Sequence, residues 1–174
     1  MDKFVTQRSA IREQHRQDRE TNMESETNTE NKLSVELSTC KEVILMVGYP
    51  GSGKSTLAKS ISEQSYQVMS LDEHKTIPKL LKIANQAIQT NSVIFDATNM
   101  TVNKRAIYIN FANEHTVPIR CVWIDMCANK AIDRVATRFE EGGKKVPKIA
   151  IYKLRKTFEE PTEEEGFKLI HIKA

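Results

Sequence analysis

A glycine-rich segment at residues 48–56 has residue types and spacing suited to holding phosphate groups. It reads GYPGSGKST, follows the apolar run VILMV, and fits the pattern G-x-x-x-x-G-K-[ST] in full. Such glycines let backbone N–H groups point inward around an anion, and the following helix adds its positive N-terminal end. Lys54 is then placed to reach β- and γ-phosphates, and the Ser55 hydroxyl to hold Mg²⁺. The candidate nucleotide-binding residues of this segment are Gly48, Tyr49, Pro50, Gly51, Ser52, Gly53, Lys54, Ser55 and Thr56.

Two carboxylates are candidates for the acceptor side of a phosphoryl transfer. Asp72, in MSLDEHK, could accept the proton of an acceptor hydroxyl, and Lys75 could contact the transferred phosphate. Asp96, in FDATN, could hold a Mg²⁺-bound water or orient the acceptor. Other roles are open: Asp72 can cap a helix, Lys75 can be a solvated charge, and Asp96 or Asn99 can form an Asx-turn.

A basic stripe is expected on a later helix. Lys130, Arg134 and Arg138 recur at four-residue spacing and precede a Gly-Gly pair at residues 142–143. A hinged lid would show this pattern, and an arginine brought over the phosphates could neutralise charge in the transition state. The alternative is a solvated helix face.

Strands alternating with helices are expected to position these residues. The expected strands cover residues 43–47, 66–71, 93–95, 117–124 and 167–172, and the expected helices cover residues 54–65, 76–88, 102–114, 129–139 and 148–158. This alternation predicts an α/β three-layer sandwich with a central parallel sheet of about five strands, helices on both faces and a small lid. Ligands bind such sheets beyond the carboxyl ends of the strands.

Composition places limits on the function classes. The 174 residues carry a net charge of +3, which argues against a general electrostatic grip on nucleic acid but allows a local basic patch. No apolar stretch predicts a membrane span, and three cysteines without zinc spacing favour an intracellular protein. Cys121 and Cys127 are each expected to be small apolar fillers. The polar residues 1–38 predict a disordered arm that could bind a protein partner, before a domain at residues 40–174.

Several segments together resemble the kinase domain of polynucleotide 5′-hydroxyl kinases, as in phage and animal end-healing enzymes. The matching segments are VGYPGSGKST, SLDEHK, VIFDATNMTVNKRAIY and VPKIAIYKLRKTFEEPTEEEGF. The glycine-rich segment is shared by many families, whereas FDATN followed by Arg105 and the C-terminal motif is far more specific. The resemblance covers residues 42 to 172.

The resemblance implies transfer of the ATP γ-phosphate, with Mg²⁺, to the 5′-hydroxyl of DNA or RNA. It implies Asp72 as general base, Lys54 and Ser55 as nucleotide and metal contacts, and Arg138 with Arg134 in the lid. The implied acceptor contacts are Lys75, Asp96, Asn99 and Arg105. Phage-type members carry arginine where Lys75 stands, and lysine makes no planar two-point phosphate contact. No D-x-D-x-T phosphatase motif is present, so no 3′-phosphatase activity is expected.

Two other functions remain open on the sequence. A small-molecule kinase of the same fold would use the same Asp72 but a closed acceptor pocket. A nucleotide-binding switch or partner module would hydrolyse ATP slowly or not at all and act through the N-terminal arm.

Overall fold

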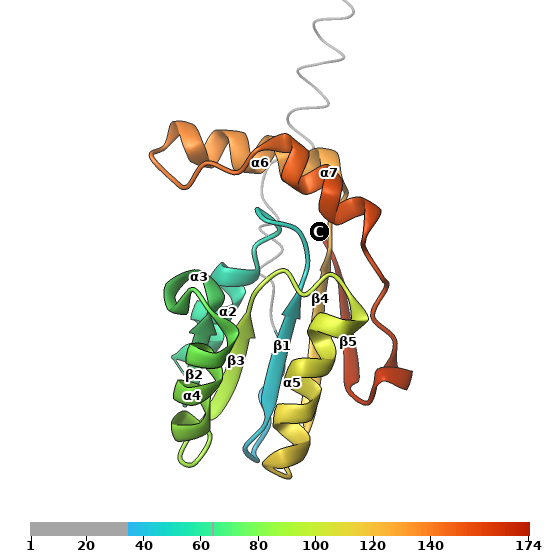
Figure 1. Ribbon diagram of the computed structural model, residues 1–174. Helices are drawn as coiled ribbons and strands as arrows, with labels where there is room; N and C mark the ends of the chain where they lie inside the picture. The colour runs from blue at the N-terminus through green and yellow to red at the C-terminus, as the bar shows by residue number, and fades with distance from the viewer. Residues whose placement is uncertain (1–34, 64) are drawn as a thin grey trace, which may run out of the picture. The chain divides into compact units, whose positions relative to one another are not determined.

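A five-stranded sheet forms the centre of the computed structural model, which describes residues 35–63 and 65–174 (Figure 1). The strands are β1 (Val43–Val47), β2 (Tyr66–Ser70), β3 (Ser92–Asp96), β4 (Ile119–Asp125) and β5 (Lys168–Lys173). They lie in the order β2-β3-β1-β4-β5, and every neighbouring pair is parallel. All carboxyl ends therefore share one edge of the sheet, and the expected α/β fold with a parallel sheet is confirmed.

β1 lies at the centre of the sheet because its residues suit burial on both faces. All five residues of VILMV are buried, with β3 on one side and β4 on the other. A strand covered on both faces needs a continuous apolar run instead of an alternating one. The glycine-rich segment begins directly after β1, so it starts at the middle of the carboxyl edge.

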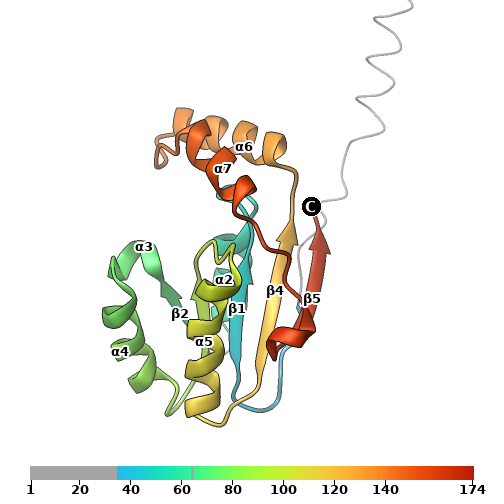
Figure 2. The same ribbon diagram turned by 45° about the vertical axis from the view of Figure 1, so that its right-hand side comes forward.

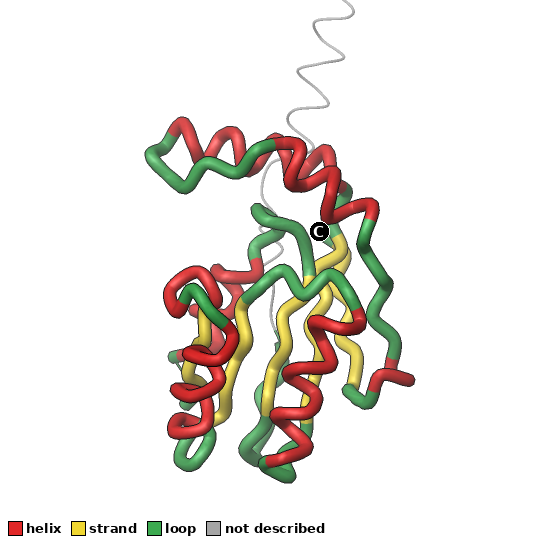
Figure 3. The backbone as a smooth tube through the Cα atoms, viewed as in Figure 1, coloured by secondary structure: helices red, strands yellow, loops and turns green. Residues whose placement is uncertain are grey.

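Helices cover both faces of the sheet. Their bounds are α2 (Lys54–Ser62), α3 (Leu71–His74), α4 (Ile77–Ala87), α5 (Val102–Glu114), α6 (Ala128–Glu140) and α7 (Lys148–Lys156), and a 3₁₀ turn covers Glu163–Glu165. α4 and α5 cover one face and α2 the other (Figures 1 and 2). α6 and α7 cross the carboxyl edge (Figure 3). The expected helices are present, but α2 ends before residue 65, and the short helix α3 was not expected.

α6 and α7 share a small apolar cluster with the glycine-rich segment. Ile132 and Val135 of α6 and Ile151 of α7 are buried together with Tyr49. Phe139, at the end of α6, is by contrast 48 % exposed. α6 and α7 are thus packed against the glycine-rich segment near the start of α6, and α6 is more open near its end.

The two cysteines expected to be fillers differ. Cys121 is fully buried in β4, as expected, and burial raises the pKa of its thiol to about 12. Cys127 is exposed, and its Sγ accepts a hydrogen bond from the backbone N–H of Lys130 at 3.4 Å. The filler role was therefore wrong for Cys127, which caps the N-terminus of α6. Cys127 stands between the apolar residues Met126 and Ala128, so its neighbours alone do not predict its exposure.

The expected N-terminal arm lies mostly outside the described residues, which begin at residue 35. Within the described part, Arg120 Nη1 donates a 2.7 Å hydrogen bond to the Glu36 carbonyl, and Ser38 N–H donates one of 3.3 Å to the Tyr66 hydroxyl. Contact with the sheet thus begins before the expected domain start at residue 40. None of the described helices combines the length and apolar character needed to span a bilayer.

Candidate active site

The glycine-rich segment forms a loop from β1 to α2 that packs closely against α6. Gly51 has φ +83°, a conformation that other residues rarely adopt. A Cβ at Gly51 would lie 2.9 Å from Val135 Cγ2 and 3.1 Å from the Ala131 carbonyl oxygen. Glycine is therefore required here both by backbone conformation and by the approach of α6. This contact connects the loop to the helix that carries the basic stripe.

Lys54 lies at the base of this loop with its ammonium group largely removed from water. The residue is 6 % exposed, and Nζ donates hydrogen bonds to the Tyr49 carbonyl oxygen at 2.7 Å and Ser52 Oγ at 3.4 Å. Burial lowers the pKa of Lys54 to about 8; nearby Asp96 opposes this shift and Arg138 adds to it. An incoming phosphate would favour the charged form of Lys54.

A cavity of about 410 Å³, here called the P-loop cleft, brings most of the expected site residues together. It is lined by Pro50, Gly51, Gly53, Lys54, Ser55, Thr56, Ser70, Leu71, Asp72, Asp96, Ala97, Thr98, Arg134, Arg138, Lys144 and Val146. Residues of the glycine-rich loop, two carboxylates and two arginines of α6 therefore face one space. Gly48 and Tyr49 do not line it, and neither do Ser52, Lys75, Asn99 or Arg105.

Asp72 extends into the cleft from α3 and pairs with a lysine of the lid. Lys144 Nζ donates a 2.9 Å hydrogen bond to Asp72 Oδ2, with exposed fractions of 67 % and 74 % for the two side chains. The caps of α3 and α4 are Ser70 and Thr76, so Asp72 does not occupy either cap position. Lys144 was not singled out from the sequence as a site residue. A long-range pair of this kind has no local sequence signal.

Asp96 ends β3 and faces the same cleft as Ser55. Carboxylate and hydroxyl oxygens are groups that Mg²⁺ prefers. The described residues hold no cluster of three His, Cys, Asp or Glu side chains suited to a metal. This donor set fits a Mg²⁺ ion that is bound mainly through nucleotide phosphates.

Arg105 occupies a different place from the one expected of an acceptor contact. It is 0 % exposed; Nε and Nη2 donate to the two Glu165 carboxylate oxygens, both at 2.8 Å. Nη1 donates to the carbonyl oxygens of Asn99, at 3.2 Å, and Glu159, at 2.9 Å. Direct contact between Arg105 and substrate is therefore not supported. Its guanidinium instead joins FDATN to the C-terminal motif FEEPTEEEGF.

Asn99 is likewise buried, with 2 % exposure, and Asn99 Nδ2 donates a 2.8 Å hydrogen bond to the Met46 carbonyl oxygen of β1. This bond holds the loop after β3 against the central strand. Asn99 thus positions the loop that carries Asp96, and its side chain does not line the cleft. The expected direct acceptor contact is not supported for Asn99 either.

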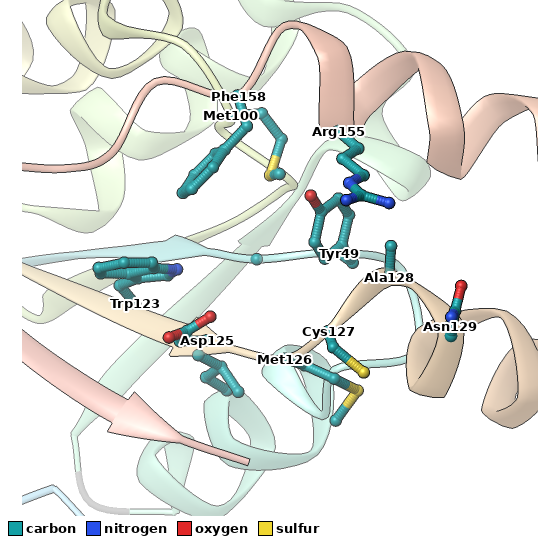
Figure 4. Close-up of a pocket in the computed structure, with 12 residues that line it drawn as sticks. Tyr49, Met100, Trp123, Asp125, Met126, Cys127, Ala128, Asn129, Arg155 and Phe158 are labelled. Carbon is teal, nitrogen blue, oxygen red and sulfur yellow. The ribbon is translucent and has the colours of Figure 1, made fainter.

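A second cavity of about 400 Å³, here called the aromatic pocket, was not expected from the sequence (Figure 4). Its lining residues are Gly48, Tyr49, Met100, Trp123, Ile124, Asp125, Met126, Cys127, Ala128, Asn129, Arg155 and Phe158. It shares no lining residue with the P-loop cleft. Its lining comes from four separate segments of the chain, residues 48–49, Met100, residues 123–129 and residues 155–158, so no single local motif predicts it.

The family model described as an AAA domain matches residues 43–87 and 74–161. Two curated proteins are similar to this chain. The bifunctional polynucleotide phosphatase/kinase of Schizosaccharomyces pombe is 38 % identical over 130 residues, 73 % of this chain and 32 % of that protein. A putative bifunctional polynucleotide phosphatase/kinase of Acanthamoeba polyphaga mimivirus is 35 % identical over 133 residues, again 73 % and 32 %. The chain thus spans about a third of the length of these relatives.

Solved structures share the fold at low sequence identity. A putative kinase from Chloroflexus aurantiacus has a TM-score of 0.61 and 15 % identity, covering 76 % of this chain and 88 % of that one. A chain of the Pnkp1/Rnl/Hen1 RNA repair complex has a TM-score of 0.56 and 21 % identity, covering 75 % and 46 %. A gluconokinase from Sinorhizobium meliloti has a TM-score of 0.56 and 15 % identity, covering 75 % and 82 %.

These structures confirm the P-loop kinase fold, and the curated relatives confirm the resemblance to polynucleotide kinases. The family model spans well over half of the residues, from β1 to the C-terminal motif. On this evidence the chain belongs to the AAA domain family.

Proposed function

We propose that this chain is a kinase that transfers the γ-phosphate of ATP to the 5′-hydroxyl end of a nucleic acid, in nucleic-acid repair. The observation that carries the proposal is the P-loop cleft, where Lys54 and Ser55 face Asp72 and the lid arginines in one cavity. Phosphoryl transfer depends mainly on positioning and charge stabilisation, and these side chains supply both.

The donor side of the reaction is assigned to the P-loop and α6. Backbone N–H groups of the loop and the Lys54 ammonium would hold the β- and γ-phosphates. Arg134 and Arg138 lie one turn apart on α6 and line the same cleft. Their guanidinium groups would neutralise negative charge on the transferred phosphoryl group. Mg²⁺ bound with ATP, near Ser55 and Asp96, would add charge neutralisation at the phosphates.

The acceptor side is assigned to Asp72. Its exposed carboxylate would accept the proton of the 5′-hydroxyl as the hydroxyl oxygen attacks the γ-phosphorus. The ion pair with Lys144 must open or shift for the acceptor hydroxyl to approach Oδ2. Such a shift is inexpensive, since exposed ion pairs contribute only about 0–1 kcal/mol. Lys144 would then be free to contact a phosphate.

The choice of a polynucleotide acceptor is supported by the two relatives named as polynucleotide phosphatase/kinases. The specific motifs of the resemblance also meet in space, because Arg105 pairs with Glu165 beside the loop that carries Asp96. A small-molecule kinase remains the alternative, because a gluconokinase shares the fold. We also propose the N-terminal arm, residues 1–38, as a binding segment for a protein partner.

The test is transfer of labelled γ-phosphate from ATP to an acceptor panel: 5′-hydroxyl DNA and RNA oligonucleotides, nucleosides and gluconate. We expect labelling of the oligonucleotides. Labelling of a small molecule alone would contradict the polynucleotide assignment.

For Asp72→Asn, we expect kcat on the oligonucleotide to fall by about 10²- to 10⁴-fold, because the variant keeps the shape but loses the proton acceptor. ATP affinity should hardly change, since other residues hold the phosphates. Glu73→Gln is the matched control: it removes an exposed carboxylate of α3 that does not line the cleft. Full turnover by Asp72→Asn would remove Asp72 from the mechanism.

A further inference from the structure

Residues 144–156, here called the basic segment, concentrate positive charge. The sequence KKVPKIAIYKLRK holds six basic residues and no acidic residue. The whole chain has a net charge of only +3, so the other residues together carry −3. All six basic side chains, Lys144, Lys145, Lys148, Lys153, Arg155 and Lys156, are exposed. Such a concentration on an otherwise acidic chain is suited to a polyanion.

The basic segment connects the two cavities of the carboxyl edge. Lys144, at its start, lines the P-loop cleft, and Arg155, near its end, lines the aromatic pocket. Between them α7 crosses above the ends of the strands (Figure 1). The two pockets also lie next to each other along the chain, since Tyr49 and Pro50 face different cavities. A polyanion in the cleft could therefore follow α7 to the pocket.

The aromatic pocket has the chemistry to hold a planar base. Phe158 lies with its ring centroid 5.7 Å from that of Trp123 and 6.4 Å from that of Tyr49, and neither pair is parallel. One face of Trp123 is covered by His171, whose ring stacks on it with centroids 4.1 Å and planes 3° apart, so only the other face of Trp123 can meet a base. In Figure 4 the Arg155 guanidinium lies beside the Tyr49 hydroxyl. Burial raises the pKa of Tyr49, and the positive charge of Arg155 opposes this rise. Aromatic rings and a guanidinium can stack on an unpaired base of any sequence.

We propose that the basic segment and the aromatic pocket bind the single-stranded part of the acceptor, several nucleotides from its 5′ end. The cations of α7 contact the backbone phosphates, and one unpaired base enters the pocket beside Arg155. This inference rests on the proposed function, because it takes the P-loop cleft as the place of the 5′ end. It assigns substrate binding to a surface outside the reacting groups.

Binding of fluorescent single-stranded thymidine oligonucleotides to the full chain, without ATP, tests the inference independently of catalysis. For Lys153→Gln/Lys156→Gln we expect weaker binding and a salt-dependence slope lower by about 1.4, since each phosphate contact on a single strand contributes about 0.7. The control Lys59→Gln/Lys168→Gln removes the same charge from exposed positions on α2 and β5. Equal losses in both variants, or no binding by the unchanged chain, would overturn the inference.

The pocket is tested with oligonucleotides of equal length in which one internal residue is abasic. The unchanged chain should bind the base-containing strand more tightly when that residue reaches the pocket, and Arg155→Gln should reduce this preference. Equal affinity at every abasic position would overturn the base site. So would an Arg155→Gln variant that raises the KM for ATP alone, because the pocket would then hold the donor nucleotide.

Labelled phosphate transfer on the same variants separates this inference from the proposed function. Oligonucleotide binding that depends on α7, without transfer, would support the surface and contradict the kinase. Transfer with a KM that is independent of acceptor length and of α7 would support the kinase and contradict the surface.

Discussion

At the residue scale, Arg105 shows how a site motif can act through packing. Its guanidinium is fully buried and makes hydrogen bonds to Glu165 and to two carbonyl oxygens, one of them in FDATN. Breaking one side of a buried ion pair leaves an uncompensated charge, whereas replacing both sides is often tolerated. Arg105 therefore acts as a positioning residue for the loop between Asp96 and α5.

We expect Arg105→Leu to lower the free energy of unfolding by about 3–5 kcal/mol, because the largely buried Glu165 carboxylate loses its cation and keeps only the hydrogen bond from the Thr162 N–H. Urea denaturation gives the measurement. The double variant Arg105→Leu/Glu165→Leu should recover part of the loss. A variant of normal stability with a raised KM for the acceptor would restore the direct-contact role.

Lys54 provides a pH-dependent prediction. Its pKa is lowered to about 8 in the folded chain, against 10.5 for a free side chain, mainly by burial. Between these values the unfolded chain binds a proton that the folded chain does not, so the contribution of Lys54 to stability rises with pH. We expect a gain of about 2 kcal/mol on going from pH 8 to 9.5 without nucleotide.

The comparison is Lys54→Met, which should lack this gain when chemical denaturation is measured at both pH values. Subtracting the stability change of the variant from that of the unchanged chain cancels the contribution of other lysines and tyrosines that titrate in this pH range. If both proteins gain equally, the ammonium of Lys54 is less buried than the structure shows.

At the element scale, the end of α6 is more ordered than a simple hinge. The Gly142 N–H donates to the Phe139 carbonyl at 3.0 Å and the Gly143 N–H to the Arg138 carbonyl at 2.8 Å, with Gly142 at φ +87°. This is the Schellman pattern that closes helices. The glycine pair therefore fixes the end of the helix that carries Arg138, and any lid movement involves the α6–α7 pair.

For Gly143→Ala we expect kcat to fall by on the order of 10- to 100-fold, because the added Cβ would lie 2.7 Å from both the Cγ and the carbonyl oxygen of Arg138. Steady-state kinetics on an oligonucleotide gives the value. Gly142→Asn is the control, since asparagine tolerates the left-handed conformation and no atom lies near that position. Unchanged turnover in Gly143→Ala would contradict a role of Arg138 in stabilising the transition state.

At the scale of the whole molecule, a buried cluster connects residues 36–42 to the amino-terminal edge of the sheet. Arg120 pairs with Glu42 through two hydrogen bonds and also contacts the Glu36 carbonyl, and the Tyr66 hydroxyl donates to Glu42 at 2.6 Å. The cluster lies at the opposite edge of the sheet from the active site. We therefore assign this cluster a role in the stability of the fold.

Removal of residues 1–34 should leave kinase activity and Tm nearly unchanged, because their sequence has no core-forming period. Removal of residues 1–40 should lower Tm by about 3–6 °C, since the contacts of Arg120 and Tyr66 to this segment are lost. Calorimetry on both truncated chains distinguishes them. A large loss with the shorter truncation would place residues 1–34 in the fold.

The sequence by itself determined the local features. The P-loop, the buried run of β1 and the acids after β2 and β3 can be identified because each depends on neighbours within a few residues. Parallel pairing then places Asp72 and Asp96 at one edge without further information. The order of the helices along the chain can be predicted in the same way, from the periodic spacing of apolar residues.

Only the tertiary structure decided which distant side chains meet. Arg105 meets Glu165 across 60 residues, and Lys144 meets Asp72 across 72. No periodic pattern in the sequence predicts either pair. The burial of each side chain and the identity of its partner depend on how separate elements pack. The aromatic pocket likewise forms only where the P-loop, the loop after β3, the end of β4 and α7 come together. Cavity shape is a property of packed surfaces, and a linear pattern of residue types does not contain it.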